Sequence, residues 1–144
     1  MPVLSRRGRL AIAAVVDIAV YSRQAPVAAK ALASRHNLPP RHLEPLLQAL
    51  VRAGILRGLR GPRGGYELAR ERKRVSCGDI VRAAMVLADE EPEALSPLVS
   101  KIVVPAVIEA EQHFHTELDK ISIDTLCQSA EALLAGRQRV LEDA

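Results

Sequence analysis

The sequence predicts a mainly α-helical chain that contains one small β-hairpin. Apolar residues recur at spacings of three and four over most of the chain, which is the period of a helix packed on one side. Two short strand-like runs flank a central stretch rich in Gly and Pro, which is typical of a hairpin. With 144 residues, 49% of them hydrophobic, the chain suits one compact head with an appended helical arm.

The charge is distributed unevenly along the chain. Residues 1–75 contain 15 Lys and Arg against 4 Asp and Glu, a net charge of +11, whereas residues 76–144 contain 5 against 13, a net charge of −8. A basic half is suited to a polyanion such as DNA. The alternative is that the arginines only keep an apolar chain in solution.

Several other classes of protein are disfavoured by composition. Aromatic residues make up 2% of the chain, which disfavours binding by rows of stacked bases or sugars. The two cysteines lie far apart, without the paired spacing of a zinc site. No apolar run approaches the roughly 20 residues of a membrane span, and residues 1–10 are basic rather than leader-like. We therefore expect a cytoplasmic protein without a metal, a cofactor or a membrane partner.

The first predicted helix begins after Ser5, a good N-cap residue, and reaches about Tyr21. Its apolar face consists of Ile12, Val15, Val16 and Ala19. Arg6, Arg7 and Arg9 crowd its start, where cations oppose the helix dipole. An external anion such as phosphate, or solvation alone, would offset that unfavourable placement.

A helix-turn-helix pattern follows. Val27 to Arg35 predicts a short helix with Ala28, Ala31 and Leu32 facing inward, and His36 to Pro39 a turn. The next helix, from about Pro39 to Ala53, has the most regular apolar spacing of the chain, carried by Leu43, Leu46, Leu47, Leu50 and Val51. Its opposite face shows residue types that can bind base edges or phosphates, namely Arg41, His42, Glu44 and Gln48. The alternative is an ordinary solvated face.

The hairpin is predicted from Ile55–Leu59 and Tyr66–Ala69, joined by the loop 60–65. Glycines in the loop permit positive φ, so its tip can bring Arg60 and Arg63 close to a DNA groove or phosphate. A nucleotide-binding loop is disfavoured because the stretch has no Gly-Lys-Ser/Thr and does not lead from a strand into a helix. The chain therefore predicts a winged helix-turn-helix head.

Beyond the hairpin, further helices are predicted. A capping box at Ser76 to Asp79 opens a helix with Ile80, Ala84 and Leu87 on one side, and 88–97 is an acidic break. A long helix from near Pro97 to Lys120 carries an apolar stripe made of Val103, Val107, Ala110, Phe114, Leu118 and Ile121. Pro105 should kink that helix or start it. Ser122 is the predicted cap of a last helix, whose apolar face holds Ile123, Leu126, Cys127, Ala130, Leu133 and Leu134.

The long helix needs something to cover its apolar stripe, and a second copy of the chain is the simplest cover. Packing back on the head is the alternative. We thus predict a DNA-binding region over 1–87, dimerisation helices over 88–135 and a flexible tail over 136–144.

Four segments together resemble one family. They are Leu4-Ser5-Arg6-Arg7-Gly8-Arg9-Leu10-Ala11, Leu43-Glu44-Pro45-Leu46-Leu47-Gln48-Ala49-Leu50-Val51-Arg52-Ala53-Gly54-Ile55-Leu56, Arg60-Gly61-Pro62-Arg63-Gly64-Gly65-Tyr66-Glu67-Leu68 and Asp79-Ile80. This set resembles the winged-helix regulators typified by IscR, NsrR, CymR and RirA, the Rrf-two family. The likeness covers Leu4 to Met85, and the later helices match in arrangement, with a local echo at Leu118 to Ser122.

The resemblance implies a bacterial homodimeric repressor or activator of transcription that binds a palindromic operator in double-stranded DNA. It implies that Glu44 reads bases, that Arg60 enters the minor groove, and that Arg41 occupies a neighbouring reading position. Phosphate contacts would come from Arg6 and Arg7 at the first helix and from wing residues such as Arg63, fixing the register on the duplex.

The sequence departs from the family at a functional position. The best-known members hold an iron-sulfur cluster with three cysteines between the fourth and long helices, but residues 88–101 contain no cysteine. Cys77 and Cys127 lie elsewhere, and His113 and His115, at i and i+2, face different helix sides. We therefore predict no cluster. The two cysteines are candidate redox thiols, although buried structural thiols are the commoner case.

The sequence leaves open the operator preference, the effector and a competing interpretation. Pro45 removes a hydrogen bond inside the recognition helix, so operator preference is expected to differ from that of relatives. The effector is a protein or a small molecule; some cluster-free relatives respond to an enzyme of cysteine metabolism. The competing interpretation is a winged-helix module that binds protein and has no operator. No recognisable catalytic motif is present, so an enzyme is not expected.

Overall fold

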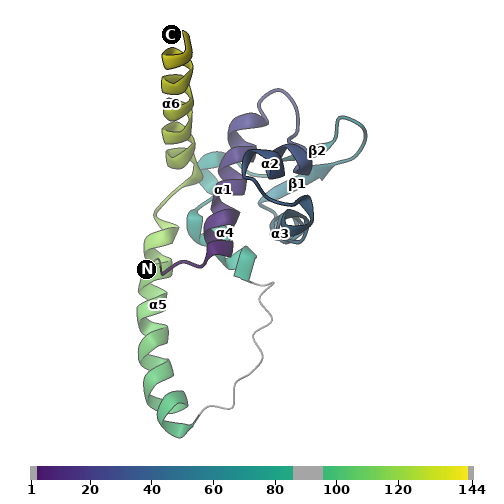
Figure 1. Cartoon of the computed structure of the whole chain (residues 1–144). Coiled ribbons are helices and arrows are strands. Elements are labelled where there is room, and N and C mark those ends of the chain that lie inside the picture. The colour runs from purple at the N-terminus through teal and green to yellow at the C-terminus, as the bar shows by residue number, and fades with distance from the viewer. Residues whose placement is uncertain (1–2, 86–95, 143–144) are drawn as a thin grey trace.

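The computed structural model describes residues 3–85 and 96–142 (Figure 1). It is mainly helical with one two-stranded hairpin, which confirms the predicted fold class. The elements, in chain order, are α1 (Arg6–Tyr21), α2 (Ala29–Arg35), α3 (Pro40–Arg52), β1 (Leu56–Leu59), β2 (Gly65–Leu68), the 3-10 turn η1 (Arg72–Arg74), α4 (Cys77–Met85), the π-helical turn η2 (Val99–Val103), α5 (Val104–Asp119) and α6 (Ile123–Glu142). No helix within these residues is long and apolar enough to cross a membrane.

Helix α1 is the centre of the head. Ser5 caps it as predicted, its Oγ accepting a hydrogen bond from the Gly8 amide at 3.1 Å. The helix packs against α2, α4, α6 and β2. Ala11, Ala14 and Ile18 are fully buried, whereas Ile12 and Val16, expected on the inner face, are only partly buried. The head core therefore packs against the face of α1 that carries Ala11, Ala14 and Ile18.

Helix α2 begins later than predicted and buries a different face. Leu32 and Ala33 are buried, but Ala28 and Ala31, expected to face inward, are exposed. The cause is Val27, which is extended and exchanges two backbone hydrogen bonds with Tyr66, at 2.8 and 2.9 Å. Helix formation starts only after this bridge, so a different set of side chains faces the core.

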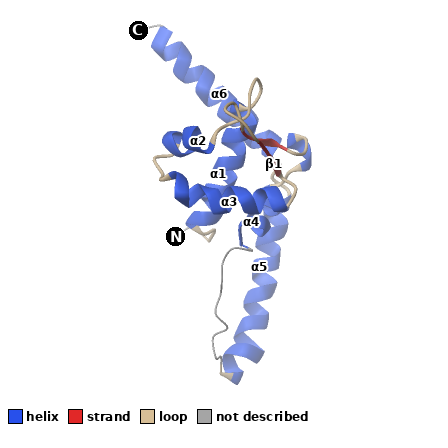
Figure 2. Ribbon diagram, turned by 90° about the vertical axis from the view of Figure 1, so that its right-hand side faces the viewer, coloured by secondary structure: helices blue, strands red, loops and turns tan. Residues whose placement is uncertain are grey.

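Helix α3 matches its sequence pattern. Pro40 stands at its first position, where a missing N–H costs nothing. Leu43, Leu47 and Leu50 are fully buried and Val51 is partly buried. Figure 2 shows α3 crossing the face of the head beside α1 and below the hairpin. Its outer side is left for other contacts.

The hairpin is antiparallel, with Leu56 paired with Leu68 and Leu59 with Gly65. Two glycines are required by the geometry. Gly61 has φ 110°, a region unfavourable for other residues. A Cβ on Gly65 would collide with the Val27 carbonyl, because Val27 pairs with the neighbouring Tyr66 and brings its backbone close to Gly65. The loop conformation is thus built into the Gly-rich sequence.

The predicted capping box opens α4. The Ser76 hydroxyl accepts a hydrogen bond from the Asp79 amide at 3.0 Å, and the Asp79 carboxylate accepts one from the Ser76 amide at 3.1 Å. Ile80 and Ala84 are buried as expected. Leu87 and most of the predicted break 88–97 lie outside the described residues.

The long helix starts at Pro97, as predicted, and widens into η2 before Pro105. A proline cannot donate the usual backbone hydrogen bond, and a π turn accommodates its ring. Pro105 then stands in the first turn of α5. The last helix, α6, ends at Glu142 and so extends into the stretch 136–144, whose flexibility stays a prediction.

The corner between α5 and α6 is fixed to the head. The Cys77 amide donates to the Ile121 carbonyl and the Ile123 amide to the Val75 carbonyl, both at 2.8 Å. Glu131 of α6 accepts one hydrogen bond from Arg72, at 2.6 Å. From this corner the two helices extend in opposite directions away from the head (Figures 1 and 2). Their near ends join the head core through Leu118, Ile123 and Cys127.

Candidate nucleic-acid interface

The eight residues predicted to contact DNA lie at the start of α1, on α3 and in the hairpin loop. Seven of them are exposed and Arg7 is partly buried. The structure gathers six of the eight around two cavities that share α3 as a wall. They are Arg6, Arg7, Arg41 and His42 at the first cavity, and Gln48 and Arg60 at the second.

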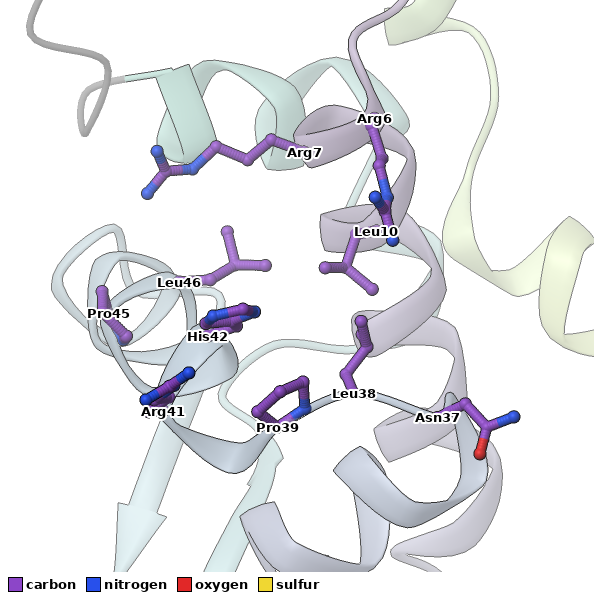
Figure 3. A pocket seen from close by; sticks show the side chains of 10 residues that line it. All are labelled: Arg6, Arg7, Leu10, Asn37, Leu38, Pro39, Arg41, His42, Pro45 and Leu46. Carbon is purple, nitrogen blue, oxygen red and sulfur yellow. The ribbon is translucent and has the colours of Figure 1, made fainter.

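The first cavity, which we name the α1–α3 pocket, has a volume of about 730 Å³. Figure 3 shows Arg6 and Arg7 on the α1 side and Arg41 and His42 on the α3 side. The lining is completed by Leu10, Asn37, Leu38, Pro39, Pro45 and Leu46. Sequence reasoning placed the four basic residues on DNA-facing elements but did not bring them to one pocket.

The second cavity, of about 310 Å³, lies between α3 and the hairpin. Gln48 of α3 and Arg60 of the loop both line it, together with Tyr66. The Gln48 side-chain amide donates a hydrogen bond to the Tyr66 hydroxyl at 3.4 Å. Tyr66 was not among the predicted site residues, although the Gly-Gly-Tyr sequence was a signal for it. This contact orients the α3 side chain toward the hairpin.

Glu44 and Arg63 line neither cavity, and both are exposed. Glu44 nevertheless shares the outer face of α3 with Arg41 and Gln48, because residues at i, i+3 and i+7 of a helix lie on one side. That face therefore connects the two cavities.

The cations at this surface are not neutralised by nearby acids. Within residues 3–85 and 96–142, no carboxylate lies within 4.0 Å of the Arg6, Arg7, Arg41, Arg60 or Arg63 side chain. Elsewhere in the head, arginines do have acidic partners; the neighbouring Arg57, for example, contacts Glu67 at 2.6 Å. The surface formed by α1, α3 and the hairpin loop therefore carries uncompensated positive charge, which favours an anionic partner.

A buried ion pair fixes the helix-turn-helix to α1. Asp17 is 7% exposed and accepts two hydrogen bonds from Arg35, at 2.6 and 2.9 Å. The His36 ring lies 3.0 Å from the same carboxylate, and the Arg35 guanidinium lies 4.0 Å from the centre of the Tyr21 ring. The hydrogen bond to Asp17 raises the pKa of Arg35 above its ordinary value. Sequence reasoning missed this cluster, which holds the end of α2 and the turn before α3.

The two candidate redox thiols are buried. Cys77 is 2% exposed and Cys127 is fully buried, and burial raises the pKa of both thiols above the ordinary value. A protonated, covered thiol reacts slowly, so their placement is that of structural residues. Their proposed redox role stays a prediction. Among the described residues, no cluster of three or more His, Cys, Asp or Glu side chains is suited to a metal ion.

Comparisons with known proteins agree with this arrangement. The model of the Rrf2 family, described as "Iron-dependent Transcriptional regulator", matches residues 4–129. The chain is 33% identical to the transcriptional regulator CymR of Bacillus subtilis over 96 residues, which are 62% of this chain and 70% of CymR. It is 35% identical to IscR of Vibrio cholerae over 80 residues, which are 56% of this chain and 46% of IscR. The chain thus spans about half the length of that relative.

Solved structures show the same fold. The IscR of T. potens superposes with a TM-score of 0.68 at 32% identity, covering 90% of this chain and 89% of that one. CymR of B. subtilis, described as its global cysteine regulator, superposes with a TM-score of 0.66 at 26% identity, covering 90% and 98%. The likeness includes the long C-terminal helices as well as the head. The chain therefore belongs to the Rrf2 family of DNA-binding helix-turn-helix transcription regulators, which are not enzymes.

Proposed function

We propose that the chain is a homodimeric regulator that binds a palindromic operator without an iron-sulfur cluster. The observation that carries this proposal is the uncompensated positive charge on the surface formed by α1, α3 and the hairpin loop. Helix α3, at the centre of this surface, can enter the major groove, while the cations on either side of it contact phosphates.

The residue roles follow the layout of that surface. Arg41, Glu44 and Gln48 occupy the outer face of α3, so in this proposal they read base edges in the major groove. Arg60 extends from the hairpin loop into the adjacent minor groove. The remaining arginines, Arg6, Arg7 and Arg63, contact phosphates and set the register, and His42 lies beside Arg41 at the same surface.

The apolar surface of α5 supports a homodimer. In this chain Val107 is 47% exposed and Val103 is 45% exposed, and both belong to the predicted stripe. Leu98 and Ile102, in the preceding helical turns, are 66% and 64% exposed. Contiguous exposed apolar surface of this kind marks an interaction site. A second copy of the chain would cover both stripes by twofold symmetry, and such a dimer would require a palindromic operator.

The cysteine content supports independence from a cluster. The family description is iron-dependent, and its best-known members use three cysteines, but the whole sequence contains two. Those two are buried in different helices, α4 and α6. His115 has a buried ring nitrogen, Nδ1, without a hydrogen-bond partner among the described residues, yet no thiol accompanies it there. The residues present therefore do not fit a cluster.

The signal that controls binding would then come from a protein or a small molecule. CymR, a relative with matching architecture, is described as a global cysteine regulator. By analogy, a partner enzyme of cysteine metabolism is one candidate effector for this chain. The exposed apolar surface of α5 and α6 also suits the competing function, a module that binds protein instead of DNA.

The dependence of duplex binding on salt separates these functions. Arg6, Arg7 and Arg63 supply three phosphate contacts in each subunit, or six in a dimer. A protein with that many contacts loses roughly 1,000-fold in affinity between 50 and 200 mM salt. We expect a loss of this size in fluorescence anisotropy with a labelled duplex. We also expect the affinity of Arg63→Gln to fall less steeply with salt than that of the control Arg52→Gln, because Arg52, in the last turn of α3, is not among the residues assigned to DNA. Weak, salt-independent binding would favour the protein-binding module.

A further inference from the structure

The α1–α3 pocket has a feature that phosphate binding does not require, an apolar floor. Leu10 from α1, Leu38 from the turn and Leu46 from α3 point toward one another between the α1 arginines and Arg41, and we call them the floor of the pocket (Figure 3). Leu46 is 2% exposed, whereas Leu10 and Leu38 keep part of their surface open. A phosphodiester would use the basic rim and leave this floor uncovered.

The size of the pocket suits a small molecule. Pro39 and Pro45 stand on its α3 side, where their rings fix the backbone angle φ. Small-molecule sites commonly occupy about 300 to 1,000 Å³, and the volume here is about 730 Å³. Such sites combine apolar walls with a few polar groups that orient the ligand. The lining of this pocket has that composition.

The rim selects the charge of the ligand. Arg6, Arg7 and Arg41 have no carboxylate within ion-pair distance in the described chain, and no acidic residue lines the pocket. A guanidinium can bind a carboxylate through two parallel hydrogen bonds. A ligand that satisfies both rim and floor therefore has a carboxylate at one end and an apolar body at the other.

We propose that the α1–α3 pocket binds a small aliphatic carboxylate, with its chain on Leu10, Leu38 and Leu46 and its carboxylate at Arg41 and the α1 arginines. The ligand would occupy cations that the proposed function assigns to DNA, so it would compete with the operator. This competition with the operator rests on the proposed function, whereas the binding of the carboxylate to the pocket does not.

Octanoate tests the pocket directly by isothermal titration calorimetry on the full chain. Each buried CH₂ contributes about 0.8 kcal/mol, or roughly four-fold in affinity when fully covered. We expect octanoate to bind about 4- to 16-fold more tightly than hexanoate, because the floor covers the added carbons in part or completely. Octanol lacks the charge and inorganic phosphate lacks the chain, so both should bind at least about 10-fold more weakly than octanoate. Equal binding of phosphate and octanoate, or no saturable binding of octanoate, would overturn the proposal.

Two matched variants locate the site. Arg41→Gln removes one rim charge and should weaken octanoate binding about 10-fold. Arg52→Gln removes a charge from the last turn of the same helix, outside the pocket, and should leave octanoate binding unchanged. Equal effects of the two variants would overturn the assignment, since octanoate would then be responding to overall charge. Circular dichroism checks that both variants keep the helical fold.

A competition titration with a bound, labelled duplex separates this proposal from the proposed function. We expect octanoate, but not octanol, to displace the duplex. Duplex binding without octanoate binding would overturn the pocket proposal and leave the DNA-binding function standing. Octanoate binding by a chain that binds no duplex would overturn the DNA-binding function and keep the pocket. Simultaneous binding of duplex and octanoate would overturn the claim that the two compete for the same arginines.

Discussion

The Asp17 carboxylate, in the last third of α1, accepts two hydrogen bonds from Arg35 at the end of α2, at 2.6 and 2.9 Å. Asp17 is buried, whereas the Arg35 side chain is one-third exposed. The pair joins the first helix of the head to the first helix of the helix-turn-helix. The position of α3 therefore depends on a charge pair as well as on apolar packing.

Arg35→Gln should lower the free energy of unfolding by about 3 kcal/mol, because it leaves a buried carboxylate without its main partner. Arg23→Gln is the matched control, since Arg23 also binds a carboxylate, Glu131, but at an exposed site. An exposed pair of that kind contributes at most about 1 kcal/mol. Chemical denaturation of both variants measures the difference. Similar losses for the two would contradict the structural role of the Asp17 pair.

Arg60→Ala should weaken binding to a specific duplex by about 1 to 3 kcal/mol. Arg57→Ala, in the neighbouring strand, is the control, because the Arg57 charge is already paired with Glu67 at 2.6 Å. Its removal should change duplex affinity only slightly. Fluorescence anisotropy at one fixed salt concentration compares the two. An equal loss would mean that the hairpin acts through its total charge rather than through a groove contact of Arg60.

Val107→Asp should convert the proposed homodimer to a monomer, because it places a charge in the apolar stripe of α5. The loss of one apolar side chain from each subunit costs about 3 kcal/mol, which raises the dissociation constant of the dimer by roughly 100-fold or more. Gln112→Asp adds the same charge on the opposite side of α5 and should leave the dimer intact. Sedimentation velocity measures both. A dimer that survives Val107→Asp would place the interface elsewhere.

Burial of the two thiols predicts a loss of stability at alkaline pH. Burial raises the pKa of Cys77 above its ordinary value of 9.0, and it does the same for Cys127. Because the thiol pKa is higher in the folded state than in the unfolded state, the contribution of the protonated thiols to stability is fully present below pH 9. It is lost as the pH rises through the folded pKa. The free energy of unfolding should therefore fall more steeply above pH 9 in the wild type than in a Cys77→Ala, Cys127→Ala variant. Identical slopes would show that both thiols titrate normally.

Local patterns were sufficient to predict some parts of this fold. The leucine spacing of α3 and the capping box before α4 depend only on neighbouring residues, and both were confirmed. The prediction of the inner face of α2 was wrong, because that face depends on a long-range bridge between Val27 and Tyr66. Sequence periodicity does not contain that kind of information.

The sequence predicted the exposed residues of the candidate site, but it did not predict the pocket that some of them line. The α1–α3 pocket forms only when α1 docks beside α3, so its floor of Leu10, Leu38 and Leu46 cannot be read from any one segment. Asp17 was missed because a single acid in a helix resembles a solvated residue. Its place between the apolar Val16 and Ile18 was the available signal.

Selection from random duplex DNA with purified, reduced protein tests the central claim most directly, with the visible absorbance recorded beforehand. We predict that colourless protein enriches an imperfect palindrome whose half-sites are centred about one helical turn apart. Glu44→Ala should enrich a more degenerate motif with little loss of affinity, because Glu44 is assigned to base reading. Enrichment only by protein with cluster absorbance, or no enriched sequence at all, would contradict a cluster-independent, sequence-specific regulator.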